Sequence, residues 1–215
     1  MDEILQKYSL LKKLNVSRET CLEFDKFISM IVDKNKEINI ISMKTADIES
    51  IKNRHIIDSA QAIEFIDLNE NTTTDLGTGG GFPGIVIAIM LKNIKKDVKV
   101  HLYEKSHHKS SFLREVSRKL NLDTEVIQKD IFDTKELKSG SIMARAFKPL
   151  PVVLELMYKN FSSYKNLILF MGKSGDAILE ETLKTWELDL EKKQSITSKD
   201  SFLLNIKNIK KIKKN

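Results

Sequence analysis

The sequence is organised around one stretch, Thr74-Asp75-Leu76-Gly77-Thr78-Gly79-Gly80-Gly81-Phe82-Pro83-Gly84. Five of the chain's eight glycines lie in it. The residues before it, from Thr72, are typical of a short strand, and the apolar run 85–91 after it is typical of a buried helix. Where a strand turns through glycines into a helix, backbone N–H groups converge on a ligand at the helix N-terminus. The stretch therefore predicts a ligand-binding loop in an α/β fold.

Two classes of ligand fit this loop. Gly79-x-Gly81-x-x-Gly84, followed by Glu104 at about the usual 20 residues, matches the dinucleotide fingerprint of an NAD-dependent oxidoreductase. The series Asp75, Gly77, Gly79 and Gly81 also matches the first motif of methyltransferases that use S-adenosylmethionine (SAM). A carboxylate at Asp75 suits the cofactor's cationic ammonium group and would repel a pyrophosphate. The loop therefore favours SAM, with NAD as the alternative.

Composition narrows the class of protein further. The chain has 215 residues, 41% of them apolar and 31% charged, as expected for one globular domain with an appendage. No apolar run approaches the roughly 20 residues that span a bilayer, and the N-terminus does not resemble a signal peptide. Cys21 is the single cysteine, which excludes an intrachain disulfide and a cysteine-rich metal site. We expect a cytoplasmic protein that binds neither a membrane nor a metal.

The positive charge is unevenly distributed. The net charge is +6, and basic residues cluster at 105–119 and at 207–215. Such clusters favour a polyanionic partner such as nucleic acid. A non-catalytic RNA- or ribosome-binding module is therefore a second alternative to a SAM-dependent enzyme.

Hydrophobic periodicity divides the chain in two. Residues 1–66 predict a helical N-terminal extension, and residues 67–215 predict a catalytic domain packed with it as one unit. The expected strands are 72–76, 98–103, 123–127, 139–144 and 165–171, alternating with helices 82–92, 107–120, 149–160 and 174–184. Segments 186–191 and 201–206 predict an antiparallel hairpin at the sheet edge. The predicted fold is Rossmann-like, with a mostly parallel sheet and an antiparallel last strand.

The carboxyl ends of the parallel strands predict where a ligand binds. These ends give a set of candidate cofactor-binding residues: Asp75, Gly77, Gly79, Gly81, Phe82, Glu104, Asp130, Ile131, Phe132 and Arg145. Glu104 is expected to accept hydrogen bonds from ribose hydroxyls, and Asp130 either accepts from the adenine amino group or caps a helix. A basic residue at a buried strand end, such as Arg145, needs a partner. Arg54 and Asp58 are four residues apart, the spacing of a helical ion pair.

Four elements together resemble the RsmG (GidB) family: Asn39-Ile40-Ile41-Ser42, Arg54-His55-Ile56-Ile57-Asp58-Ser59, the glycine stretch, and Ala144-Arg145-Ala146. They occur in the family's order, from about residue 20 to 185. The resemblance implies a class I SAM-dependent methyltransferase acting on guanine N7 in the 530 loop of 16S ribosomal RNA. The implied partner is that RNA, the 30S subunit or its assembly intermediate. The chain is expected to be a monomer.

By the same resemblance, Gly77, Phe82, Ile131, Phe132 and Arg145 match positions that contact SAM. Arg145 and Lys173 are expected to be catalytic, and Arg54, His55 and Lys173 are expected to contact the RNA substrate. Two departures from the family pattern stand out. Met171 occupies the place of a usual lysine, which Lys173 is expected to replace, and the chain ends in a lysine-rich segment where the family often carries Pro and Arg.

Overall fold

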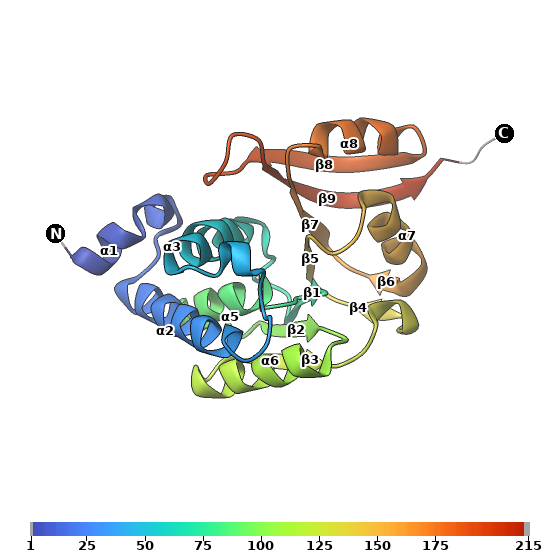
Figure 1. Ribbon diagram of the computed structural model, residues 1–215. Coiled ribbons are helices and arrows are strands. Elements are labelled where there is room, and N and C mark those ends of the chain that lie inside the picture. Colours follow the sequence, from blue (N-terminus) through green and yellow to red (C-terminus); the bar gives the residue numbers. More distant parts are fainter. Residues whose placement is uncertain (1, 213–215) are drawn as a thin grey trace.

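The computed structural model describes residues 2–212, and its centre is a seven-stranded sheet (Figure 1). The strand order is β3-β2-β1-β5-β7-β9-β8. The strands are β1 (Thr72–Leu76), β2 (Lys99–Tyr103), β3 (Thr124–Ile127), β5 (Ser141–Arg145), β7 (Asn166–Met171), β8 (Trp186–Gln194) and β9 (Phe202–Lys211). The first five are parallel to one another, and β9 runs antiparallel to both β7 and β8. This confirms the predicted fold, with β9 inside the sheet and β8 at its edge.

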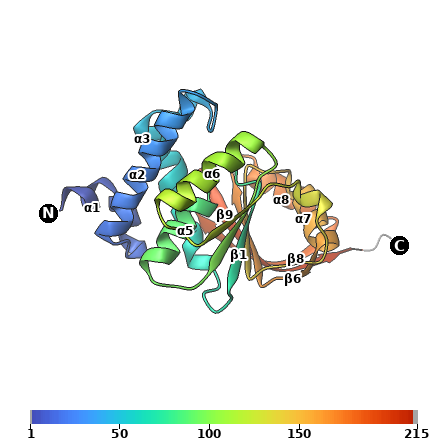
Figure 2. The ribbon, with the colours of Figure 1, turned by 90° about the horizontal axis from the view of Figure 1, so that it is seen from below.

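Helices cover both faces of the sheet (Figure 2). On one face lie α5 (Gly84–Asn93) and α6 (His107–Lys119), and on the other lie α7 (Leu150–Asn160) and α8 (Gly175–Leu183). Residues 84–91 of α5 are all buried, because this helix is enclosed between the sheet and the N-terminal helices. The two faces have separate hydrophobic clusters, so each side of the sheet has its own core.

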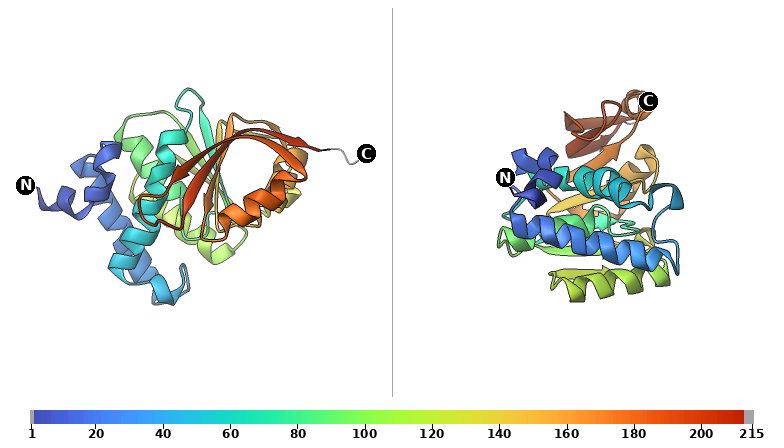
Figure 3. Two further views of the ribbon diagram at one scale, coloured as in Figure 1. Left: turned by 90° about the horizontal axis from the view of Figure 1, so that it is seen from above. Right: turned by 60° about the vertical axis from the view of Figure 1, so that its left-hand side comes forward.

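The N-terminal extension is helical, in several short pieces. In chain order these are α1 (Glu3–Lys7), η1 (Ser9–Leu14), α2 (Arg18–Asn35), η2 (Met43–Thr45), α3 (Ile48–Ser50), the π-helical η3 (Ile51–Ile57), α4 (Asp58–Ala60) and η4 (Gln61–Phe65). The longest, α2, begins at the predicted cap Ser17 and packs beside α5 and α6 (Figure 3). Its buried apolar residues belong to the same cluster as those of α5 and α6. The predicted boundary at residue 66 stays a prediction.

Two features were not predicted from the sequence. A small parallel sheet pairs β4 (Leu137–Lys138) with β6 (Phe161–Ser163). Residues 207–211, expected to belong to a basic terminal cluster, instead extend β9, because β8 offers pairing partners along its whole length. Lys210 pairs with Glu187 at 2.8 Å and Lys211 with Glu155 at 2.9 Å, so part of the expected charge is neutralised. Residues 213–215 of that cluster lie outside the described residues.

Within 2–212, no helix is long and apolar enough to cross a bilayer.

Candidate active site

The glycine loop connects β1 to α5 and is held mainly by its own backbone. The N–H groups of Gly81 and Phe82 both donate to the carbonyl of Thr78, at 2.9 and 3.0 Å. Gly77 and Gly79 have positive φ angles of 67° and 58°, which favour glycine. A Cβ at Gly77 would lie 2.3 Å from the ring of Phe147, so the loop has room for no side chain there.

Asp75 lies inside this loop. Its carboxylate is fully buried and accepts a hydrogen bond from the N–H of Gly84 at 2.7 Å, at the start of α5. Burial raises the pKa of this carboxyl to about 7. The orientation differs from the expectation that Asp75 faces a cofactor ammonium group, because the nearest backbone donor is on the helix side. Asp75 therefore holds the loop against the first turn of α5.

A cavity of about 420 Å³ opens at the carboxyl ends of β1, β2, β3 and β5. This volume is in the range of small-molecule sites. Eight of the ten predicted cofactor residues line it: Gly77, Gly79, Phe82, Glu104, Asp130, Ile131, Phe132 and Arg145. The other two, Asp75 and Gly81, are buried behind the loop. Sequence reasoning did not assign several lining residues to the site, among them Thr45 and Lys148.

Two carboxylates stand on one side of the cavity. Glu104 accepts from the N–H of Gly79 at 3.0 Å and from that of Ser106 at 2.7 Å, so it ties the loop to the start of α6. Asp130 accepts from the N–H of Phe132 at 3.2 Å, which makes it the cap of the short helix 131–133 that the sequence left open. Both side chains also line the cavity, and each oxygen retains a free lone pair for a ligand.

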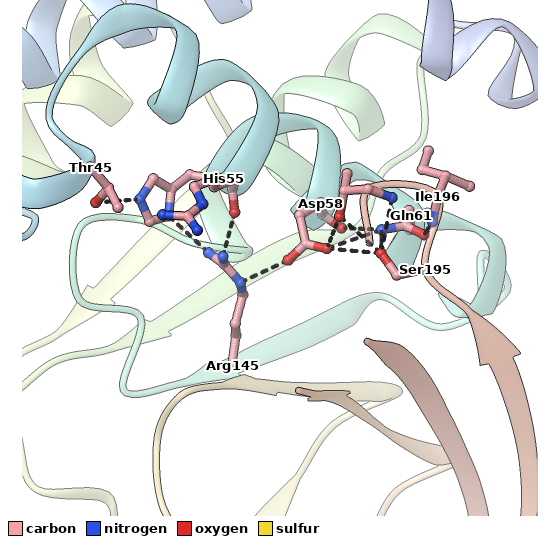
Figure 4. Close-up of polar contacts among 9 residues, drawn as sticks. Thr45, His55, Asp58, Gln61, Arg145, Ser195 and Ile196 are labelled. Carbon is pink, nitrogen blue, oxygen red and sulfur yellow. Dashed lines mark hydrogen bonds and ion pairs between the residues drawn. The ribbon is translucent and has the colours of Figure 1, made fainter. Parts of the chain in front are cut away.

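Arg145 occupies the other side of the cavity, at the end of β5 (Figure 4). Its Nε lies 3.1 Å from Oδ2 of Asp58, its Nη1 lies 3.1 Å from Nδ1 of His55, and its Nη2 donates to the backbone carbonyl of Arg54. The expected Arg54–Asp58 ion pair is not formed. Residues 51–57 form a π-helical turn, whose i→i+5 bonds change how residues four apart align, and the Arg54 side chain is exposed.

His55 is neutral in this arrangement. A guanidinium has only donors, so Nδ1 of His55 accepts from Arg145, and the ring proton lies on Nε2, which donates to Oγ1 of Thr45 at 3.1 Å. Burial, and then the charge of Arg145, lower the His55 pKa to about 4. The ring also stacks on Phe82, with centroids 4.9 Å apart. His55 therefore joins Arg145 to the glycine loop.

Comparison with known proteins identifies the family of this chain. The family described as GidB, rRNA small subunit methyltransferase G, matches residues 20–206. The chain belongs to this family. A relative in Pelagibacter ubique named ribosomal RNA small subunit methyltransferase G is 66% identical over 98% of this chain and 99% of its own length. A relative of the same name in Cereibacter sphaeroides is 31% identical over 94% and 98%.

Solved structures show the same fold at low identity. A SAM-dependent methyltransferase from Aquifex aeolicus has a TM-score of 0.55 and 15% identity, covering 81% of this chain and 97% of that one. A methyltransferase from Geobacter sulfurreducens has a TM-score of 0.52 and 13% identity, covering 85% and 88%. The resemblance inferred from the four sequence elements is thus confirmed, as is the Rossmann-like class I fold.

In this GidB-family chain, Asp58 is shared between Arg145 and a distant loop. The loop between β8 and β9 reaches the Oδ1 of Asp58 through the hydroxyls of Thr197 at 2.9 Å and Ser195 at 3.3 Å. Beside it, Gln61 accepts from the N–H of Ile196 at 2.8 Å (Figure 4). Sequence reasoning missed these contacts, because 137 and 139 residues separate the partners and no local pattern marks them.

Lys173 lies apart from the cavity. It is exposed in the turn between β7 and α8, and neither an ion pair nor a hydrogen bond joins its side chain to another described residue. Its expected roles in catalysis and RNA contact stay predictions, as does the expected contact of Arg54 with the RNA. Among residues 2–212, no group of three or more His, Cys, Asp or Glu side chains is placed to hold a metal ion.

Proposed function

We propose that the protein transfers a methyl group from SAM to N7 of a guanine in 16S ribosomal RNA. The observation that carries this proposal is the family match over residues 20–206, supported by the 66% identical relative that aligns along nearly its whole length. The match favours this reaction over an NAD-dependent oxidoreductase and over a non-catalytic RNA-binding module.

The cavity suits SAM in volume and in chemistry. Glu104 and Asp130 end neighbouring strands and can accept hydrogen bonds from ribose hydroxyls and an amino group. Ile131 and Phe132 offer apolar surface for a flat ring, and Phe132 is 37% exposed for such contact. When bound, SAM supplies a methyl group on a positively charged sulfur, which keeps the bonding electron pair as the methyl group departs.

Methylation of guanine N7 requires little acid–base chemistry from the protein. It carries a lone pair and no proton in neutral guanine, so the new nitrogen–carbon bond forms without a general base. His55 is consistent with this, because it is neutral and both its ring nitrogens already have partners. The protein's task is to align the reacting atoms and to exclude water. Arg145 uses three of its five N–H groups within the protein, which leaves two for a substrate or cofactor oxygen.

The RNA is expected to lie across the cavity mouth. Lys109, Lys129 and Lys148 line the cavity and form no ion pair with any described residue. Unpaired lysines at the mouth of a site attract the phosphates of an RNA backbone. We propose that the partner is the small ribosomal subunit or its assembly intermediate, and that a cytoplasmic monomer of this protein binds it.

The test is methyl transfer from labelled SAM to small subunits isolated from cells that lack this modification. We expect label in 16S rRNA, and cleavage at 7-methylguanine should map it to one position. Naked 16S rRNA and partly assembled particles, assayed in parallel, identify the preferred substrate. Thermal melts with SAM and with NAD provide the cofactor control. Stabilisation by NAD alone, or no label in the RNA, would contradict the proposal.

A further inference from the structure

A second cavity lies next to the cofactor cavity, on the side of β7 and β9. Its volume is about 310 Å³. Arg145 and Ala146 line both cavities, so the two sites meet at the end of β5. Ala146 has a φ angle of 49°, a left-handed conformation that is uncommon for a residue other than glycine. Such backbone strain tends to occur at functional sites.

The chemistry of this second cavity matches a planar base with a polar edge. Phe170, Met171 and Phe202 contribute apolar wall, and Arg145, Ser195 and Ser201 contribute polar groups. The Arg145 side chain is 19% exposed, although it is paired with Asp58. A guanine base has flat apolar faces, and its O6 accepts from an arginine while leaving the N7 lone pair free.

The outer wall of the cavity is tied to the Arg145 side chain. Ser195 and Ser201, at the ends of the β8–β9 loop, both line the cavity. The same loop binds Asp58 through Ser195 and Thr197, and Asp58 holds Nε of Arg145. One carboxylate therefore fixes both the wall and the cation beside it.

We propose that the second cavity receives the acceptor guanine, with the β8–β9 loop (residues 195–201) as its outer wall. This inference rests on the proposed function, because it assigns the place of the base that the reaction methylates. The cofactor cavity and the acceptor cavity then meet at Arg145 and Ala146, where the methyl group must pass.

Gly172→Leu tests the assignment. Gly172 lines the second cavity but not the first, its φ is not positive, and an added Cβ meets no heavy atom within 4 Å. The Cβ of a residue at this position therefore meets no clash, and the leucine adds bulk at the rim of the second cavity. We expect at least a tenfold loss of methyl transfer to small subunits. The melting temperature should be unchanged. The affinity for S-adenosylhomocysteine, measured by calorimetry, should stay within twofold of wild type.

Ala177→Leu is the matched control, because Ala177 is exposed on α8 and lines neither cavity. It adds the same side chain and should leave transfer unchanged. Wild-type transfer by Gly172→Leu would overturn the inference. So would an equal loss of S-adenosylhomocysteine affinity, which would make this cavity part of the cofactor site. An inactive wild-type protein would instead overturn the proposed function.

Photo-crosslinking locates the base directly. Small-subunit RNA carrying 6-thioguanosine at the methylated position is bound to the full chain with S-adenosylhomocysteine and irradiated. We expect crosslinked peptides from 170–172 or 201–203, whose residues line the second cavity. Crosslinks confined to Lys105, Lys109 or Lys129, which line only the cofactor cavity, would overturn the assignment.

Discussion

The two sides of the candidate site are built in different ways. The glycine loop comes from a single stretch of chain, and its backbone makes most of its hydrogen bonds. The cluster around Arg145 brings together side chains from the N-terminal helices, the end of β5 and the β8–β9 loop, with partners 87 to 139 residues apart. The loop should therefore depend on backbone conformation, whereas the Arg145 cluster should depend on individual side chains.

Arg145→Ala should have the largest effect, because one guanidinium serves three partners in the cluster. We expect methyl transfer to fall on the order of a hundredfold, comparable to removing a key donor from an active site. The fold should persist, with a loss of about 1–3 kcal/mol as Asp58 loses its partner. Labelled transfer and chemical denaturation measure the two effects. Arg145→Lys should remain impaired, because an ammonium cannot reproduce the planar fork. Wild-type turnover by Arg145→Ala would remove this residue from the site.

Paired alanine substitutions examine the loop. Gly77 and Gly79 both have positive φ, but a Cβ at Gly77 meets the Phe147 ring at 2.3 Å, whereas at Gly79 the nearest atom is 3.9 Å away. Gly79→Ala should therefore cost about 1 kcal/mol of backbone strain, and Gly77→Ala about 2–3 kcal/mol. Gly77→Ala should also weaken S-adenosylhomocysteine binding roughly tenfold, because displacing the Phe147 ring disturbs the wall of the cofactor cavity. A tenfold change in affinity corresponds to about 1.4 kcal/mol. Equal losses of stability and affinity in the two variants would show that the ring contact is unimportant.

Asp58→Asn separates the cluster from the loop. The amide keeps the size of the side chain but removes the charge that holds Arg145 and accepts from Ser195 and Thr197. We expect kcat on small subunits to fall about tenfold, while the affinity for S-adenosylhomocysteine stays unchanged. If Asp58 served only to stabilise the fold, the melting temperature and the cofactor affinity would fall together, and kcat would follow the folded fraction.

The buried Asp75 and the half-buried His55 should give opposite, smaller pH effects on stability. Asp75 titrates near pH 7 in the fold and near 3.8 when unfolded, so the folded state binds the extra proton and stability falls as pH rises toward 7. His55 titrates near pH 4 in the fold and near 6.5 when unfolded, so stability falls as pH drops from 6.5 toward 4. Relative to wild type, Asp75→Asn should gain stability as pH rises and His55→Gln as pH falls. Parallel melting curves across this range would contradict both assignments.

The same contrast explains what could be predicted from the sequence. The positions of β1, the glycine loop and α5 follow from local patterns, and so do the carboxyl strand ends that supply Glu104, Asp130 and Arg145. The orientation of Asp75 does not follow, because both the ammonium of a ligand and the N–H of Gly84 are plausible partners on sequence grounds. The pairing of Asp58 with Arg145 depends on a π-helical turn and on a contact across 87 residues of chain, which no local spacing reveals.

The position of β9 between β7 and β8 affects the order in which the nascent chain can fold. Every segment that lines the cofactor cavity precedes residue 149, whereas half of the second cavity's lining comes from residues 172–203. During synthesis, β8 can join the sheet only after β9 has been made, because within the described residues β8 pairs with β9 alone in the seven-stranded sheet. We therefore expect a partly made chain to acquire the groups for holding its methyl donor before it can admit an RNA base.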